Sequence, residues 1–290
     1  MSASAKPSAK PSAKQGPLAS PSREGASAPP APGELRAIAL FAEACETVLE
    51  RLGQSLERRT LRARAVLGFD ASLRGKAGFV RSGVCRLMAV SPGGASLCLQ
   101  RLQPGDHFEL ASALAGGEPL TGLRIVGVET AELVFAPAPA LADAAALCPR
   151  FAAALIEALA ATHQQTAWKL FEFTTLDLRA RLLGQLLHLG EAGALQRGVI
   201  VIDKPPTQRE LAETVGAARE GVARQLGAFA DEGLIERSAG RLTLLDVRRM
   251  LEQHYALCGR SFSAYAPGGR LAGPWFAQGG IGQQRRGNVS

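Results

Sequence analysis

The stretch TQRELAETVGAAREGVARQLGAFADEGLIER, residues 207–237, decides the fold. It contains a helix start at Thr207, a helix-ending glycine at Gly216, and an amphipathic run that begins at Arg219. A short hairpin sequence that turns at Gly240 follows. This order of elements predicts a winged helix-turn-helix, the arrangement that places one helix in the major groove of DNA.

The first predicted helix of this stretch starts with a capping box. The Thr207 hydroxyl can accept from the amide of Glu210, and the Glu210 carboxylate can accept from the amide of Thr207. The helix is expected to continue to Gly216, which can adopt the left-handed conformation that ends a helix and turns the chain.

The second predicted helix has one apolar side and one polar side. At 100° per residue, the apolar side chains are Val222, Leu226 and Phe229. The opposite side presents the small residues Ala223 and Gly227 together with three charged side chains, Arg219, Glu220 and Arg224. Arginine can donate two hydrogen bonds to guanine, and glutamate can accept from the N4 amine of cytosine, so this side has the chemistry to read G·C pairs.

A plainer interpretation is a solvated helix face with an ion pair between Glu220 and Arg224, four residues apart. The order of capped helix, turn, helix and hairpin favours DNA reading. Arg237 and Arg241 flank the hairpin tip, where they either contact phosphate or are ordinary surface residues beside a turn. With Thr207 and Gln208 at the helix start, they complete the predicted DNA-binding set.

The net charge of +7 does not argue for nucleic-acid binding, because the terminal segments carry it. Residues 1–33 have net charge +3, residues 259–290 have +4, and residues 34–258 are neutral. Residues 203–258 contain eight basic and nine acidic side chains. A second hypothesis therefore stays open, in which a signal-binding module uses its winged helix to contact protein instead of DNA.

The same composition excludes several classes of protein. The repeats of Ala, Pro, Ser and Lys in residues 1–33 and the Gly-rich residues 259–290 predict disordered tails, although Trp275 and Phe276 lack an explanation there. Without a signal peptide or an apolar run of 18 residues, we expect a cytoplasmic protein with no membrane partner. There is no nucleotide-binding, hydrolase or zinc-protease motif, so we expect neither an enzyme nor a bound metal.

The histidines and cysteines show no ligand spacing. The four histidines, His107, His163, His188 and His254, are scattered, and His107 is interpreted as a loop residue. The five cysteines are Cys45, Cys85, Cys98, Cys148 and Cys258. They favour small buried apolar side chains, and a thiol sensor or an iron-sulfur ligand set is the alternative.

Upstream of the winged helix, the chain reads as a β unit followed by a long helix. Apolar spacing predicts a helix over 33–56, and short strands between Pro/Gly turns predict an antiparallel β unit over about 61–134. Seven positions with a mean spacing of 3.5 then form one seam, namely Ala152, Ile156, Leu159, His163, Thr166, Leu170 and Phe173. Such a seam suits either a two-fold dimer or burial within the same domain. A further helix is predicted over 176–189.

Three segments resemble the CRP/FNR superfamily of bacterial transcription regulators. They are TLDLRARLLGQLLHL (175–189), residues 207–237 above, and GVCRLMAVSPGGASLCLQRLQPGDHF (83–108). The resemblance implies an α+β fold with a β-roll of the cyclic-nucleotide-binding type, a double-stranded β-helix, over 34–150. It also implies a dimerisation helix and hinge over 151–176 and a winged helix over 177–258.

The function implied is a homodimeric transcription regulator that reads a palindromic site and contacts RNA polymerase. Arg219, Glu220 and Arg224 correspond to the base-reading R-E-x-x-x-R of the catabolite-activator branch, which implies a TGTGA-like half-site. Ala218 stands where the recognition helix often starts with Ser or Thr, a change that costs about 1 kcal/mol of capping.

The sensor departs from the cyclic-AMP branch of the superfamily. The effector pocket is expected around Glu109, Leu110, Thr121, Arg124 and Thr166. Phe108-Glu109 and Leu120-Thr121 replace the Gly-Glu and Arg-Ser pairs that hold ribose and cyclic phosphate in that branch, and Arg124 is off register. Thr166 matches a base-contacting Thr, but Ala167 replaces the adjacent Ser. The effector is therefore unassigned and a cyclic nucleotide is disfavoured. The N-terminal cysteine set of the iron-sulfur branch is missing.

Overall fold

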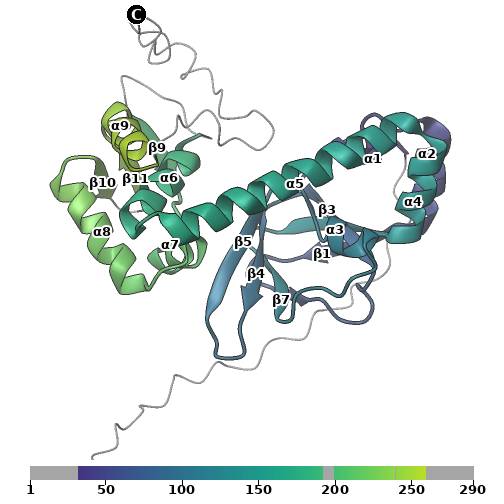
Figure 1. Ribbon diagram of the computed structural model, residues 1–290, viewed down its shortest axis with the longest axis horizontal. Helices are drawn as coiled ribbons and strands as arrows, with labels where there is room; N and C mark the ends of the chain where they lie inside the picture. Colours follow the sequence, from purple (N-terminus) through teal and green to yellow (C-terminus); the bar gives the residue numbers. More distant parts are fainter. Residues whose placement is uncertain (1–31, 192–198, 239, 259–290) are drawn as a thin grey trace, which may run out of the picture.

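A long helix joins a β-roll to a small helical domain (Figure 1). The computed structural model describes residues 32–191, 199–238 and 240–258. The mixed helices and antiparallel sheets confirm the predicted α+β class. The predictions for the two tails, including Trp275 and Phe276, lie outside the described residues.

The β-roll consists of two four-stranded sheets, in the orders β1-β8-β3-β6 and β2-β7-β4-β5, and every strand pair is antiparallel. Its strands are β1 (Glu57–Leu61), β2 (Val66–Gly68), β3 (Lys76–Ser82), β4 (Cys85–Val90), β5 (Ser96–Leu102), β6 (His107–Phe108), β7 (Leu123–Gly127) and β8 (Ala131–Pro137). A short helix, α3 (Leu110–Leu114), follows β6. Apolar side chains from both sheets, including Phe108, Ile125 and Phe135, form one buried cluster.

The N-terminal helix predicted over 33–56 is wrong as a continuous element. The structure has α1 (Pro32–Leu35), a 3-10 turn η1 (Ala39–Phe41) and α2 (Glu46–Ser55). The apolar side chains that suggested one helix are nonetheless buried together, among them Leu35, Phe41 and Leu49. The spacing arises because three short helical segments, separated by breaks, each turn their apolar side toward the same core.

Helix α5 (Pro149–Thr175) follows α4 (Ala138–Leu147) and spans about 40 Å at 1.5 Å per residue. Its first turns are buried through Phe151 and Leu155. Further along, Lys169 donates to the carbonyl oxygens of Cys98 and Leu99 on β5, at 2.7 and 2.9 Å. Burial lowers the pKa of Lys169. One side of α5 is thus fixed to the roll along much of its length.

The C-terminal domain has a three-stranded sheet and four helices around one core. Its elements are α6 (Leu178–Gly190), β9 (Ile200–Asp203), α7 (Gln208–Val215), α8 (Arg219–Asp231), β10 (Ile235–Ser238), β11 (Arg241–Leu244) and α9 (Val247–Cys258). The helix predicted over 176–189 is confirmed as α6. Strand β9 pairs antiparallel with β11 and was not predicted.

A charged contact fixes α7 against the β-roll. Arg86 on β4 donates to Glu213 at 3.1 Å and lies 3.3 Å from Glu210. The Ser96 hydroxyl donates to the second oxygen of Glu213, also at 3.1 Å. The side chains of Arg86 and Glu213 are only 14% and 12% exposed. The winged helix is therefore docked on the hairpin of β4 and β5 as well as covalently attached to α5.

Candidate nucleic-acid interface

The start of α7 has the predicted capping box. The amide of Glu210 donates to the Thr207 hydroxyl at 3.2 Å, and Glu210 Oε2 accepts from the Thr207 amide at 2.8 Å. Gly216 ends the helix with φ 62° and ψ 51°. Both predictions are confirmed, and the short turn that follows delivers the chain directly into α8.

Helix α8 separates an apolar side from a charged one. Val222, Leu226 and Phe229 are at most 2% exposed and pack into the domain core. Arg219, Glu220 and Arg224 are exposed. Within the described residues, none of these three charged side chains has a hydrogen bond or an ion pair, so the alternative Glu220–Arg224 pair is not formed. The three charged groups are available to an external partner.

An ion pair fixes the end of α8 against α6. Arg179 on α6 donates to both carboxylate oxygens of Glu232, which follows the last residue of α8, at 2.8 and 2.7 Å. Its guanidinium also lies 4.9 Å from the centre of the Phe229 ring. Hydrogen bonding to Arg179 lowers the pKa of Glu232. The helix that presents the charged side chains is thus fixed along its underside and at its end, whereas its first turn has no side-chain cap at Ala218.

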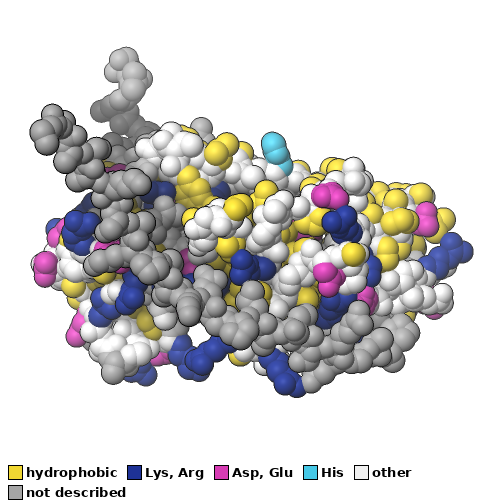
Figure 2. Space-filling view, turned by 90° about the horizontal axis from the view of Figure 1, so that it is seen from below, with side chains coloured by type: hydrophobic (Ala, Val, Ile, Leu, Met, Phe, Trp, Pro, Cys, Tyr) yellow, Lys and Arg dark blue, Asp and Glu magenta, His cyan; other side chains and the backbone are white. Residues whose placement is uncertain are grey.

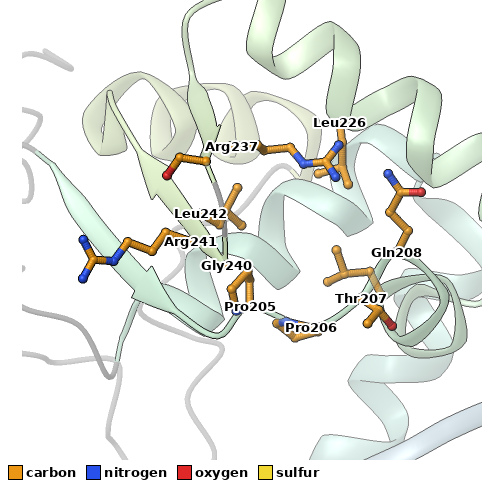
Figure 3. A pocket seen from close by; sticks show the side chains of 11 residues that line it. Pro205, Pro206, Thr207, Gln208, Leu226, Arg237, Gly240, Arg241 and Leu242 are labelled. Atoms are coloured by element: carbon orange, nitrogen blue, oxygen red, sulfur yellow. The ribbon is translucent and has the colours of Figure 1, made fainter.

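The predicted hairpin is present as β10 and β11, with Gly240 at φ 75° in its turn. Between this wing and the start of α7 lies a hollow of about 510 Å³. Figure 3 shows Arg237 extending along it toward Gln208, whose amide oxygen can accept from both terminal nitrogens of Arg237 at 3.3 Å. The structure therefore brings together Thr207, Gln208, Arg237 and Arg241 around one hollow.

The surface charge is mixed. Arg241 donates to Asp203 at 2.8 Å, so its charge is partly compensated. Figure 2 shows basic and acidic side chains interspersed over the face in view. Residues 203–258 likewise contain eight basic and nine acidic side chains, so recognition by the winged helix must depend on where individual arginines lie and not on a uniform positive field.

The expected effector residues do not gather as the DNA-binding set does. Glu109 adopts a left-handed conformation (φ 55°) before α3, followed by Leu110, which is 2% exposed. Arg124 lies on β7, in the other sheet, and Thr121 is exposed in the loop before it. Thr166 is exposed on α5. One helical turn earlier, Thr162 contacts His107 through an Oγ1 to Nε2 distance of 3.0 Å, a contact that sequence reasoning missed.

Apolar side chains fill the interior of the roll. A side-chain carbon added at Gly78 would lie 1.9 Å from the Phe108 ring, so the glycine makes space for that ring. Phe69 and Phe135 contact Phe108 edge-on, with ring centres 6.1 and 5.8 Å away. Burial raises the pKa of Glu109, whose Oε2 has no hydrogen-bond partner among the described residues. Leu120 stands where the cyclic-AMP branch has its phosphate-binding arginine, and a cyclic phosphate needs such a cation.

Comparison with known proteins identifies the family. Residues 180–253 match a family model described as a Crp-like helix-turn-helix domain. The chain is 32% identical over 182 residues to the transcriptional regulator SdrP of Thermus thermophilus, and the match covers 62% of this chain and 84% of that protein. The chain belongs to the CRP/FNR family of transcription regulators. Its relatives are regulators and not enzymes.

Among the further matches, two have a signal in their names. A cAMP-activated global regulator of Mycobacterium tuberculosis is 28% identical over 171 residues, or 58% of this chain and 75% of that protein. The structure of a CRP/FNR regulator from T. thermophilus is 27% identical, with a TM-score of 0.50, 69% of this chain covered and 100% of that chain. The c-di-GMP-responsive regulator CLP of Xanthomonas campestris shares the fold at 21% identity, with a TM-score of 0.59 and 69% and 99% covered. None of the described helices is long and apolar enough to cross a membrane.

Proposed function

We propose that this regulator reads a palindromic DNA site as a homodimer, with Arg219, Glu220 and Arg224 contacting base edges in the major groove. The observation that carries the proposal is the charged side of α8. Its three side chains are exposed and unpaired within the described residues, above an underside that is fully buried. Arginine and glutamate in this arrangement can recognise guanine and cytosine, and a TGTGA-like half-site contains such pairs.

The hollow beside the wing supplies the contacts that orient the domain on DNA. Arg237 and Arg241 lie at the wing, and Thr207 and Gln208 lie at the start of α7, where free helix amides and polar side chains suit a phosphate oxygen. These contacts carry no sequence information. Their substitution is expected to weaken binding to all duplexes alike, in contrast to substitution on α8.

The dimer forms along α5 in this proposal. Ile156 and Leu170 are 66% and 64% exposed, the two highest values among the large apolar side chains described. His163 lies midway between them and is also exposed, so the three residues are spaced by seven along one side of the helix. A row of this kind pairs with an identical row across a two-fold axis, which would bury both leucines and both isoleucines.

Each domain has a separate role in this proposal. Residues 34–150 sense a signal, residues 151–176 dimerise and form the hinge, and residues 177–258 bind DNA and bring RNA polymerase to the promoter or exclude it. We do not expect the signal to be a cyclic nucleotide, because Phe108 stands in place of the glycine, and Leu120 in place of the phosphate-binding arginine, of the cyclic-AMP branch. Titration with cyclic AMP is expected to give no heat of binding, and saturable binding would overturn this part.

The dimer is tested by analytical ultracentrifugation. Leu170→Glu is expected to shift the protein from dimer to monomer, since each charge would be buried against its copy. Leu120→Glu is the matched control, because Leu120 is 59% exposed and lies in the loop before β7 and not on α5. A Leu170→Glu protein that sediments as a dimer would place the interface elsewhere.

DNA reading is tested by binding to duplexes that differ at single base pairs. Arg219→Ala and Arg224→Ala are each expected to lose about 1–3 kcal/mol of discrimination at one base pair. Arg248→Ala removes the same charge from α9 and is expected to leave discrimination unchanged. Binding should also weaken steeply as salt rises. Equal affinity of the α8 variants for all duplexes, or a flat salt response, would instead favour a winged helix that contacts protein.

A further inference from the structure

Two cysteines that are 103 residues apart in the chain meet where two helices begin. Cys45 immediately precedes α2, and Cys148 immediately precedes α5. The backbone N–H of Cys45 donates to the Sγ of Cys148 at 3.4 Å. In Figure 1 this junction lies at the end of α5 that is remote from the winged helix. The site is therefore separate from the proposed DNA interface.

The surroundings of Cys148 favour a thiolate. The N–H groups of Phe151, Cys45 and Arg150 and the Cys45 thiol all lower the pKa of Cys148, and among them the N–H of Cys45 donates to its sulfur at 3.4 Å. The N–H groups of Phe151 and Arg150 belong to the first turn of α5, where free N–H groups and the helix dipole stabilise negative charge. Cys148 is buried, at 4% exposure, whereas Cys45 is exposed. One thiol is accessible to solvent and the other is a shielded nucleophile beside it.

The other three cysteines lie in the opposite environment. Burial raises the pKa of Cys85 to about 12 and that of Cys258 to about 11, and it also raises the pKa of Cys98. These thiols stay protonated at neutral pH and react slowly with oxidants, because the thiolate is the reactive form. The contrast within one chain distinguishes the Cys45 and Cys148 pair from ordinary buried cysteines.

The two cysteine-bearing segments are in direct contact, because the Cys45 backbone nitrogen lies 3.4 Å from Cys148 Sγ and the Cys45 thiol is close enough to lower the pKa of Cys148. A disulfide needs the two sulfurs to come within about 2.05 Å of each other. On the outside of the same junction, Arg150 lies 3.9 Å from Glu43, in an exposed ion pair that joins the same two segments.

We infer that Cys45 and Cys148 form a peroxide-reactive dithiol site that closes to an intramolecular disulfide. The Cys45 thiol first passes its proton to the Cys148 thiolate that it contacts. The Cys45 thiolate then attacks one oxygen of hydrogen peroxide and the O–O bond breaks, which leaves a sulfenic acid on Cys45. The departing hydroxide takes the proton from Cys148 and leaves as water, so that Cys148 is again a thiolate. The Cys148 thiolate then attacks the Cys45 sulfur, an S–S bond forms, and the S–O bond breaks. The second hydroxide takes up the proton that Cys148 had released. Two thiols and one peroxide thus give one disulfide and two waters.

The test is peptide mapping of the full chain after limiting hydrogen peroxide, without reductant. Cleavage by trypsin after Lys and Arg leaves Cys45 in the peptide 37–51 and Cys148 in the peptide 125–150. Each of the other three cysteines lies in a separate peptide. A disulfide that links these two peptides is expected, with two fewer titratable thiols. Cys45→Ser and Cys148→Ser should each abolish the link, and Cys258→Ser, the matched control, should keep it.

Labelling with dimedone, which reacts with sulfenic acids, tests whether Cys45 is oxidised before the disulfide forms. In Cys148→Ser the sulfenic acid on Cys45 has no nearby thiolate to resolve it, so dimedone should label Cys45 there and not in the wild type. Circular dichroism of each variant establishes that it is folded. The inference is overturned if the wild type forms no 37–51 to 125–150 link, or if its disulfides join two chains instead of one. It is also overturned if dimedone labels Cys45 equally in both proteins.

Discussion

The contact between Arg86 and Glu213 is expected to couple the β-roll to the winged helix energetically. At an effective dielectric of about 20, two unit charges about 4 Å apart attract by roughly 4 kcal/mol. Because both side chains are less than 15% exposed, part of this attraction offsets their lost hydration, as it does for buried pairs. We expect a net coupling energy of about 2 kcal/mol, well above the 0–1 kcal/mol of a surface pair.

A double-mutant cycle measures this energy. Arg86→Gln, Glu213→Gln and the double variant are made in a Trp275→Phe background, so that Trp168 on α5 is the only tryptophan left. Urea unfolding followed by its fluorescence gives the free energy of unfolding of each protein. Each single change should lower the free energy of unfolding. In the Glu213→Gln variant, Arg86 still has the Glu210 carboxylate at 3.3 Å as a partner, which reduces the loss. The double change should cost less than the sum of the two.

The exposed pair Asp203 and Arg241 provides the control cycle, since these side chains are 71% and 63% exposed. Its coupling energy should be below about 0.5 kcal/mol. Equal coupling energies for the two pairs, or additive effects of Arg86→Gln and Glu213→Gln, would refute the reasoning from burial.

Three further predictions concern the fold around the two sites. Gly78→Ala should lower the free energy of unfolding by about 1–3 kcal/mol through overpacking against Phe108, and the added Phe108→Leu should recover part of that loss in the same urea titration. Thr207→Ala removes the capping hydroxyl of α7 and should cost about 1 kcal/mol in thermal unfolding, whereas Thr174→Ala, on the exposed end of α5, should cost less. Burial lowers the pKa of His254 below its usual 6.5. As the pH falls, His254 is therefore protonated in the unfolded chain at a higher pH than in the folded protein. Stability is then complete above pH 6.5 and falls as the pH drops below it, and His254→Gln should flatten this slope.

The winged helix was predictable because its signals are local. The capping box lies within Thr207 to Glu210, the turn needs only Gly216, and the spacing of Val222, Leu226 and Phe229 fixes which side of α8 is buried. Each of these depends on residues within one or two helical turns of one another. The exposure of the three charged residues follows directly, since they occupy the remaining side of the same helix.

The contacts that orient this domain were not predictable in the same way. Arg86 and Glu213 are 127 residues apart, and nothing in the sequence around either residue indicates the other. Strand β9 was missed because no hairpin turn joins it to its partner, unlike β10 and β11, and its pairing with β11 depends on the completed domain. The break between α1 and α2 was missed for a related reason, because apolar periodicity reports burial and not continuity of the helix.

Selection of bound sequences from a random DNA pool tests most directly whether the charged side of α8 reads bases. The wild-type protein should enrich a palindrome whose half-site centres lie about one helical turn, or 10–10.5 base pairs, apart. Arg224→Ala should lose the preference at one G·C pair in each half-site and keep the rest, with Arg248→Ala selecting the same sequence as the wild type. A pool that stays random after selection with the wild type, or an Arg224→Ala protein that enriches the unchanged palindrome, would contradict base reading by α8.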